Sequence, residues 1–309
     1  MTSVILSALL LVAIDPYDQS GVPIEADTTN PKLAKIVLVA GTPSHPPGAH
    51  EYLATQAVLK GLLDQNPGVF VSIVRDSWPK NPKIFEKARA IVWYTDGAKN
   101  HPLLQADKFQ VLKGYIDKGT GFVALHYALN MTKELGEKML PWLGGVFDPE
   151  ISGGTGAIKW TPVFKSLPSH AITRGVVPFT INDEWYFNMR FVPGMKGVTP
   201  ILAGAPPEEL RKNEDTKKHP GRPEVLAWTY ERANGGRSFA ITTPHSHEDW
   251  ADENLRRLVV NGILWTAKVE VPKAGAKVAL NPVDLKRNLD DKRPKAAEAK
   301  PTAPTPKSP

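Results

Sequence analysis

Five histidines share one kind of position, at or just beyond the end of an apolar run that predicts a strand: His45, His50, His126, His245 and His247. Four carboxylates lie in or beside such positions: Glu51, Asp96, Asp183 and Glu184. An imidazole donates or accepts a proton near neutral pH with little help from its surroundings. Histidines and carboxylates together also form an acceptable ligand set for zinc or manganese. The pattern therefore predicts acid/base or metal chemistry.

His126 occupies the most informative of these positions. It ends the apolar run of "GFVALHYALN", residues 121–130, where a strand turns into a segment that could begin a helix. In α/β enzymes, a sharp turn of this kind often presents a nucleophilic Ser or Cys. A purely structural residue would more economically be apolar or small, so an imidazole here favours a functional role.

The other candidates each have a simpler explanation. His45 lies in a Pro/Gly-rich loop, where an imidazole is commonly just solvated, and Glu51 would suit the dipole of a following helix. His245 and His247 are two apart, so in an extended segment they point to the same side and chelation is possible. Two further histidines are expected to be surface residues: His101 and His219.

Several chemistries are excluded by what the sequence lacks. The chain contains no Cys, which rules out disulfides, thiolate metal sites and a cysteine nucleophile. It also contains no G-x-S-x-G, no G-x-x-x-x-G-K-[ST] and no H-E-x-x-H motif.

Apolar runs alternate with amphipathic segments in the first half of the chain. Strands are predicted within residues 35–41, 69–76, 87–97 and 121–126, and helices within 50–68 and 105–119. Strands dominate the second half, at 158–164, 179–187, 197–204, 224–231 and 237–244, before a helix at 252–268. This order predicts an α/β fold with a mostly parallel sheet, helices on both faces and a strand-rich C-terminal half. Functional residues should gather beyond the carboxyl ends of the strands.

Charge and length limit the partners. The chain has 309 residues, a net charge of +6 and a pI of about 9.3. Residues 286–309 alone carry +4, so the body is nearly neutral. Because the body shows no basic stripe with interleaved aromatics, we expect no nucleic-acid binding.

Composition also suggests where the folded domain lies. The apolar run 4–14 has the length of a signal peptide, which favours export to the periplasm or the extracellular space; a cytoplasmic protein with a buried N-terminal element is the alternative. No other run is a candidate membrane span. Residues 1–34 are thus assigned to a leader and linker, 35–270 to the α/β domain, and the Pro/Lys/Ala-rich residues 271–309 to a disordered tail. Because residues beyond about 285 lack apolar anchors, truncation at residue 285 should leave the melting temperature almost unchanged.

Five stretches together resemble the trehalose-utilisation (ThuA-like) domain family: "KIVLVAGTPSH", "GTGFVALHYA", "HAITRGV", the "NDEWYF" block and "GGRSFAITTPHSHEDW" with the following "RLVVNGILWTA". They occur in the family's order over roughly residues 34–268. The resemblance implies a flavodoxin-like, class I glutamine-amidotransferase-like sheet. It also implies a role in sugar catabolism, notably the processing of a keto-disaccharide or keto-glycoside.

By resemblance, His126 falls at the elbow where amidotransferases carry Cys, so amidotransfer through a thioester is excluded here. His245 matches the histidine after the family's GR-containing strand, and Asp183 and Glu184 match its acidic-aromatic block. The loop "TPHSHEDW" is richer in His than the family pattern, which leaves the role of His247 open.

These considerations favour a sugar-modifying enzyme whose partner is a small sugar or glycoside. The expected catalytic residues are His126, His245 and Glu184. The expected substrate-binding residues are His45, His50, Asp96, Asp183, Trp185 and His247. A divalent metal, most plausibly zinc, would be held by His45, His126 and His245; in the metal-free alternative, His126 acts directly as the acid/base. The second hypothesis is a non-catalytic carbohydrate-binding or scaffold module on a degenerate amidotransferase-like fold.

Overall fold

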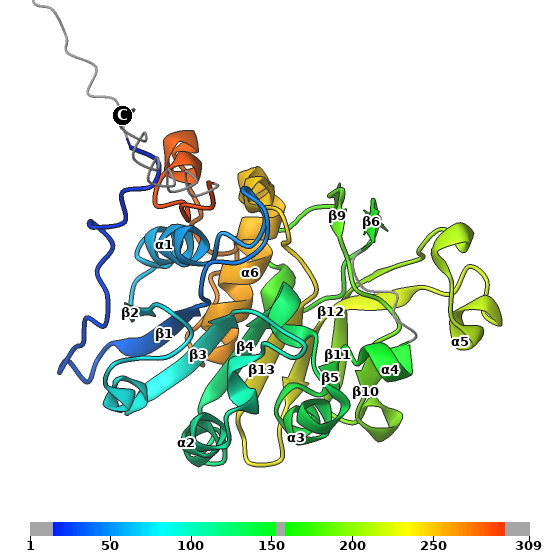
Figure 1. Ribbon diagram of the computed structural model, residues 1–309, viewed down its shortest axis with the longest axis horizontal. Coiled ribbons are helices and arrows are strands. Elements are labelled where there is room, and N and C mark those ends of the chain that lie inside the picture. The colour runs from blue at the N-terminus through cyan, green and yellow to red at the C-terminus, as the bar shows by residue number, and fades with distance from the viewer. Residues whose placement is uncertain (1–14, 153–157, 294–309) are drawn as a thin grey trace, which may run out of the picture.

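A seven-stranded sheet forms the centre of the protein (Figure 1). Its strands are β1 (Ala34–Ala40), β2 (Val69–Val74), β3 (Ala88–Tyr94), β4 (Gly121–Leu125), β11 (Val198–Gly204), β12 (Glu224–Glu231) and β13 (Arg237–Ile241). The computed structural model describes residues 15–152 and 158–293, so the expected signal segment 4–14 lies outside the described residues. The longer helices are α1 (Tyr52–Leu63), α2 (Ala106–Ile116), α3 (Lys133–Leu143) and α6 (Glu253–Thr266). The shorter elements are β5 (Gly145–Val146), β6 (Lys159–Trp160), β7 (Val163–Phe164), β8 (Phe179–Thr180), β9 (Asp183–Glu184), β10 (Arg190–Phe191), α4 (Pro149–Ser152) and α5 (Glu214–Lys217).

The strand order is β11-β12-β13-β4-β3-β1-β2. The five strands from β13 to β2 pair in parallel, while β12 runs antiparallel to both of its neighbours. This arrangement confirms the predicted mostly parallel α/β sheet. It also brings the ends of β1, β3, β4 and β13 to one edge.

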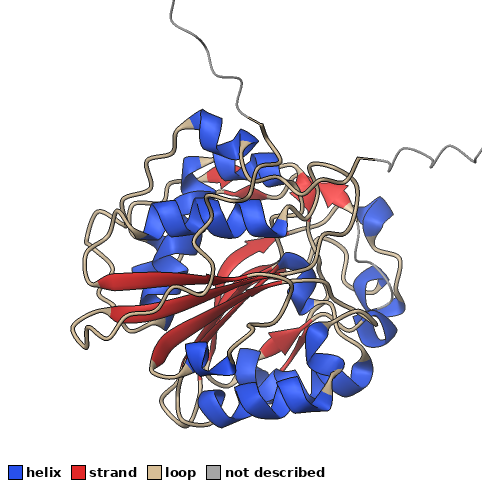
Figure 2. Cartoon of the chain, turned by 60° about the vertical axis from the view of Figure 1, so that its left-hand side comes forward, coloured by secondary structure: helices blue, strands red, loops and turns tan. Residues whose placement is uncertain are grey.

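Helices cover both faces of the sheet, as Figure 2 shows. In β1, Ile36 and Leu38 belong to the core that includes α1 and α6, whereas Val37 and Val39 belong to the core that includes α2 and α3. A strand that is buried on both faces needs apolar residues at every position, which explains the continuous apolar run in the sequence.

The strand-rich half differs in detail from the prediction. Residues 158–164 and 179–187 form only two-residue strands, which pair outside the main sheet as β6 with β9 and β7 with β8. Pro162 separates β6 from β7 because proline cannot donate to a strand ladder. Helix α3 was not predicted, and its interior contains Pro141.

The predicted boundary at residue 270 is wrong for residues 271–293. Val271, Ala276 and Val278 are buried, and Asn261 of α6 accepts a hydrogen bond from the Ala276 amide at 2.8 Å. This segment therefore packs on the α1/α6 layer, and the remaining part of the expected tail, 294–309, lies outside the described residues. The Pro/Lys-rich composition did not indicate this packing, because residues 271–279 are bound largely through hydrogen bonds to their backbone groups.

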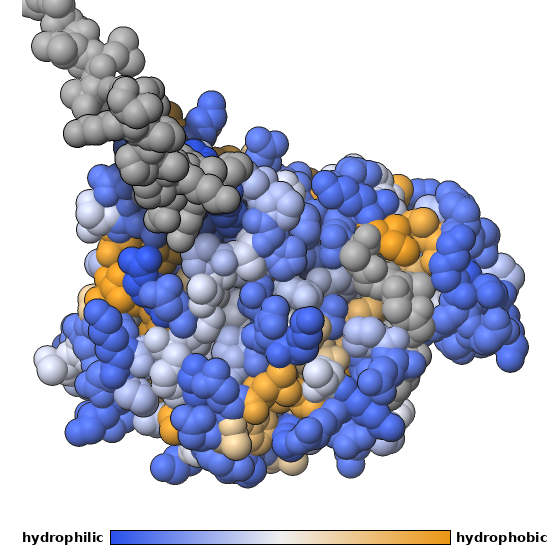
Figure 3. All heavy atoms as spheres, in the orientation of Figure 1, coloured by the Kyte–Doolittle hydropathy of each residue, from blue (hydrophilic) through white to orange (hydrophobic). Residues whose placement is uncertain are grey.

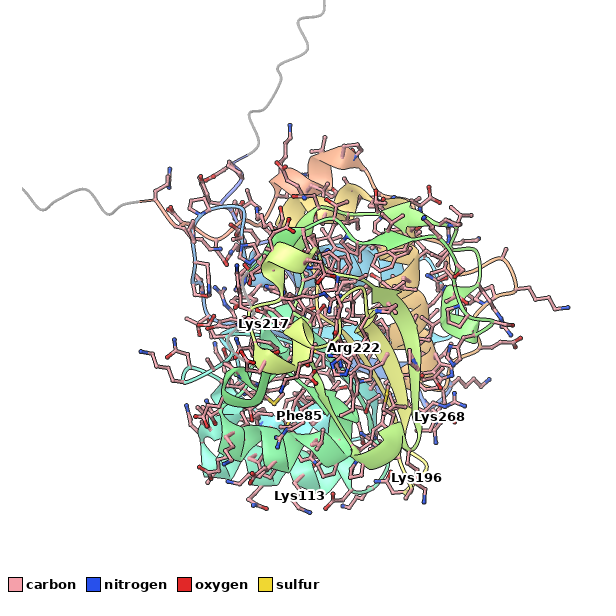
Figure 4. The ribbon with its side chains drawn as sticks, turned by 90° about the vertical axis from the view of Figure 1, so that its right-hand side faces the viewer. Phe85, Lys113, Lys196, Lys217, Arg222 and Lys268 are labelled. Atoms are coloured by element: carbon pink, nitrogen blue, oxygen red, sulfur yellow. The ribbon has the colours of Figure 1, made fainter. Side chains whose placement is uncertain are left out.

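On the face shown in Figure 3, apolar side chains form separate patches among hydrophilic ones. The exposed lysines labelled in Figure 4, Lys113, Lys196, Lys217 and Lys268, lie on separate parts of the chain, whereas Phe85 is buried. Of the helices in the ranges described, none combines the length and the apolar character needed to cross a bilayer.

His101 is buried, contrary to the expectation of a surface position, whereas His219 is exposed as predicted. The ring of His101 caps the short turn Pro102–Leu104: its Nδ1 accepts from the Leu103 amide at 3.1 Å, and its Nε2 lies 3.3 Å from the Ala128 carbonyl oxygen. Burial lowers the pKa of His101 from 6.5 to about 4.

This burial makes stability depend on pH. The pKa is lower in the folded state, so the unfolded state binds more protons between pH 6.5 and 4, and stability falls as the pH falls through that window. The His101 contribution should amount to about 2 kcal/mol between pH 7 and pH 5. H101N keeps an oxygen that can accept from the Leu103 amide and removes the titration. We expect urea denaturation of H101N to show a smaller loss of unfolding free energy on acidification than the wild type; equal losses would contradict this assignment.

Candidate metal and catalytic site

Three chain segments bring histidines to the carboxyl edge of the sheet. His50 lies in the loop after β1, His126 directly follows β4, and His245 lies in the loop after β13. His126 has φ +47° and His50 has φ +49°, in the left-handed region that non-glycine residues rarely adopt. Such conformations persist only where the surrounding structure enforces them, and they concentrate at functional sites.

The loops after β1 and β13 pair with each other. Ala49 and Ser246 form an antiparallel bridge, the His50 amide donates to the His245 carbonyl at 3.0 Å, and the His247 amide donates to the Gly48 carbonyl at 2.9 Å. This short ladder brings the two imidazoles of His50 and His245 together.

Three ring nitrogens converge. His50 Nε2 lies 3.1 Å from His126 Nε2 and 3.0 Å from His245 Nδ1, and the last two are 3.3 Å apart. We call these three residues the histidine cluster.

The opposite ring nitrogens fix the tautomers of two members. The Thr242 carbonyl oxygen, 2.8 Å from His126 Nδ1, can only accept, so Nδ1 carries the proton. Tyr52 donates its hydroxyl proton to Asp96 at 2.7 Å and therefore accepts from His50 Nδ1 at 2.9 Å. Both Nε2 atoms consequently present lone pairs to each other.

Burial keeps the cluster uncharged. It lowers the pKa of His126 to about 4 and also lowers the pKa values of His50 and His245. The single ring proton of neutral His245 can satisfy at most one of the two facing lone pairs. A cation between the nitrogens would satisfy all three.

Glu184, on β9, is the carboxylate beside the cluster. Its Oε2 lies 3.5 Å from His245 Nδ1 and its Oε1 lies 4.0 Å from His126 Nε2. Burial, together with the neighbouring Asp183 carboxylate, raises the pKa of Glu184 to about 7. Tyr186, two residues further along, stacks on the His126 ring with 4.8 Å between centroids.

His45 lies outside the cluster, on its exposed side. Its ring centroid is 3.8 Å from that of His50 and 6.4 Å from that of His245. Its Nδ1 lies 2.8 Å from the Ser44 hydroxyl, which donates to Asp96 at 2.6 Å. Asp96 thus receives both Ser44 and Tyr52 and supports His45 and His50 indirectly.

The expected metal trio of His45, His126 and His245 therefore differs from the observed cluster, in which His50 replaces His45. The left-handed turn at His50 and its pairing with the β13 loop direct that ring inward. A second group with three possible donors, His45, His50 and Asp96, shares His50 with the cluster.

Three residues expected to bind substrate are buried instead. Asp183 accepts from the hydroxyl of Thr243 and from the amides of His245 (2.7 Å) and Ser246 (3.3 Å), so it holds the β13 loop. The Trp185 ring is fully buried and donates to the Ile181 carbonyl at 3.2 Å.

His247 is the third. Its Nδ1 lies 3.0 Å from the hydroxyl of Thr55, inside the α1/α6 layer. His247 begins a 3-10 turn, His247–Ala251, so the extended geometry that would have placed it beside His245 does not hold.

Sequence reasoning missed Tyr52, Tyr186 and Thr242. Tyr186 carried a signal, since alternation along "NDEWYF" places it on the same side as Glu184. The sequence contained no signal for Tyr52 or the Thr242 carbonyl, because the role of each depends on which imidazole nitrogen it contacts.

The spacing of the histidine cluster fits a metal. Zinc–nitrogen bonds of about 2.0–2.1 Å at tetrahedral angles separate neighbouring ligand nitrogens by roughly 3.3–3.4 Å. The observed separations of 3.0–3.3 Å are close to this value. The hydrogen bonds of Thr242 and Tyr52 also supply the outer support that metal-binding histidines usually have.

Comparisons with known proteins agree with this fold. The family model "Trehalose utilisation" (ThuA) matches residues 37–266. A ThuA-like protein from Parabacteroides merdae has a similar solved structure, with 18% identity, a TM-score of 0.55 and coverage of 83% of this chain and 99% of that one. A second, from Bacteroides uniformis, has 16% identity, a TM-score of 0.50 and coverage of 82% and 98%. No curated protein sequence matches this chain. The match over residues 37–266 shows that the chain belongs to the trehalose utilisation (ThuA) family.

Proposed function

We propose that the protein is a metal-dependent enzyme that binds zinc through His50, His126 and His245 and acts on a carbohydrate. One observation carries the metal assignment: two imidazole lone pairs face each other at 3.1 Å, with a third ring nitrogen within 3.3 Å of both. Neutral imidazole nitrogens are suitable zinc ligands, and three of them leave a coordination position open.

The residues beside the open side of the cluster suggest the chemistry. A bound zinc ion polarises a carbonyl or lowers the pKa of a water molecule. Glu184 would take up or release the proton, since its carboxylate lies within 4.0 Å of two cluster nitrogens. The Tyr127 ring, 5.2 Å from both His45 and His50, offers an aromatic edge at the exposed side.

A keto-disaccharide or keto-glycoside is the proposed substrate class. The support is the family description, trehalose utilisation, together with a polar site that can act on a carbonyl group. Turnover of a panel of disaccharides and their keto derivatives tests this assignment. Binding without turnover across the panel would favour the carbohydrate-binding module instead.

Elemental analysis tests the metal. Protein purified without a histidine tag should carry about one equivalent of zinc, or take it up on reconstitution. H50A, H126A and H245A should each retain less than about a tenth of an equivalent, because each removes a ligand from a three-histidine site. H45A and the exposed-site control H219A should keep their zinc.

The H45A variant distinguishes the observed cluster from the trio expected from sequence. Zinc loss in H45A together with retention in H50A would replace our assignment by that trio. A wild-type protein that neither carries nor takes up zinc or another divalent ion would refute the metal site.

Substitution of Glu184 tests its role in proton transfer. E184Q preserves the shape of the side chain and removes the exchangeable carboxyl proton, so turnover should fall by about 10²–10⁴-fold with zinc content unchanged. The exposed Glu209 provides the matched control, and E209Q should behave as the wild type. Loss of zinc in E184Q would instead show that Glu184 is a fourth ligand.

A further inference from the structure

His50 needs external support to take its place in the cluster. Its φ of +49° is in the left-handed region, which costs a residue with a Cβ on the order of 1–3 kcal/mol. Its amide donates to the His245 carbonyl at 3.0 Å, but its own carbonyl and that of Ala49 face away from this ladder.

A buried lysine near the C-terminal end of the described chain donates hydrogen bonds to these two carbonyls. Lys292 Nζ donates to the Ala49 carbonyl at 2.5 Å and to the His50 carbonyl at 3.2 Å. It also lies 3.1 Å from Glu51 Oε1, and its side chain is only 6% exposed. All three ammonium donors therefore serve residues 49–51.

Glu51 joins the loop around His50 to the C-terminal end of the described chain through both of its carboxylate oxygens. Oε1 accepts from the Gly48 amide at 2.8 Å, and Oε2 accepts from the Asp290 amide at 2.7 Å. The carboxylate neutralises the buried ammonium and ties the loop around His50 to residues 288–293, which we call the C-terminal strap.

The strap is itself anchored by the N-terminal segment. Gln19 Nε2 lies 3.1 Å from the carbonyls of Asn288 and Leu289 and from Asp290 Oδ1. The Leu289 amide donates to the Pro16 carbonyl at 2.8 Å. In Figure 1 the short turn Pro282–Lys286, which precedes the strap, lies beside α1.

We propose that Lys292 is a positioning residue of the site, which holds the backbone of His50 in the left-handed turn that aims its ring into the histidine cluster. The proposal rests on the proposed function in that it takes His50 as a zinc ligand. Lys292 acts through the carbonyls of residues 49 and 50, and it contacts no ring nitrogen of the cluster.

Two truncated chains and substitutions at Lys292 and Glu51 test the proposal. A chain ending at Arg293 keeps the strap, whereas a chain ending at Arg287 lacks it. K292M removes the ammonium but leaves the Glu51 carboxylate buried and unpaired, which is itself destabilising. The double variant E51Q/K292M removes both of these charges and leaves the Asp290 carboxylate, 3.9 Å from Lys292 Nζ, in place. E51Q alone keeps Lys292 and loses one of the two amide contacts of Glu51, so the difference between E51Q and the double variant reports the loss of the lysine. K286M, at an exposed position on the preceding segment, is the control.

Two readouts are needed: zinc affinity, by competition with a chromophoric chelator, and amide hydrogen exchange of peptides covering residues 44–52. The Arg287 truncation and E51Q/K292M should bind zinc about 10–100-fold more weakly than the wild type, as expected for loss of outer support. Exchange should accelerate in residues 44–52 while the β1, β3 and β4 peptides stay protected. The Arg293 truncation and K286M should match the wild type.

Wild-type zinc affinity in E51Q/K292M, with unchanged exchange in residues 44–52, would overturn the proposal. Uniformly faster exchange over the whole sheet would also overturn it, because Lys292 would then support only global stability. If the wild type binds no zinc, the proposed metal function fails, and the exchange data alone still decide whether Lys292 holds the His50 turn.

Discussion

The hydrogen bond from His126 Nδ1 to the Thr242 carbonyl joins the ends of two neighbouring parallel strands, β4 and β13. It fixes the tautomer of His126 and points the Nε2 lone pair toward His50 and His245. Because this bond uses a backbone carbonyl, its geometry is set by the register of the sheet. The position of the site therefore follows from the pairing of β4 with β13.

Each member of the histidine cluster has its own means of support. Thr242 orients His126, the Tyr52–Asp96 pair orients His50, and Asp183 holds the backbone of His245. These supports come from different strands and loops and share no group with one another. Such separate, buried hydrogen bonds hold polar side chains in one arrangement, which a site built on loops requires.

The sequence was most informative where a residue's neighbours along the chain decide its environment. Strands buried on both faces appear as continuous apolar runs, so β1 and β4 were predicted near their observed bounds, and His126 was found at the end of β4. Helix α3 was missed because Gly136 and Pro141 interrupt its pattern.

The sequence could not show whether His45 or His50 belongs to the histidine cluster, and the reason is physical. Both lie in one Pro/Gly-rich loop, and both have positive φ. His50, unlike His45, pairs with residues 245–247 and has its carbonyl bound by Lys292, and both partners lie about two hundred residues away along the chain. A similar separation along the chain explains why the packing of residues 271–293 was not predicted and why composition alone assigned them to a tail.

The long separation between His50 and Lys292 also has a consequence for biosynthesis. The two residues are 242 positions apart, so at about 5–20 residues per second the ribosome adds Lys292 on the order of ten to fifty seconds after His50. During that interval β1, β3 and β4 can already be paired, while the turn at His50 lacks its lysine. The nascent chain can therefore pair these strands before Lys292 is available, although His50 is the first of the three cluster histidines to be translated.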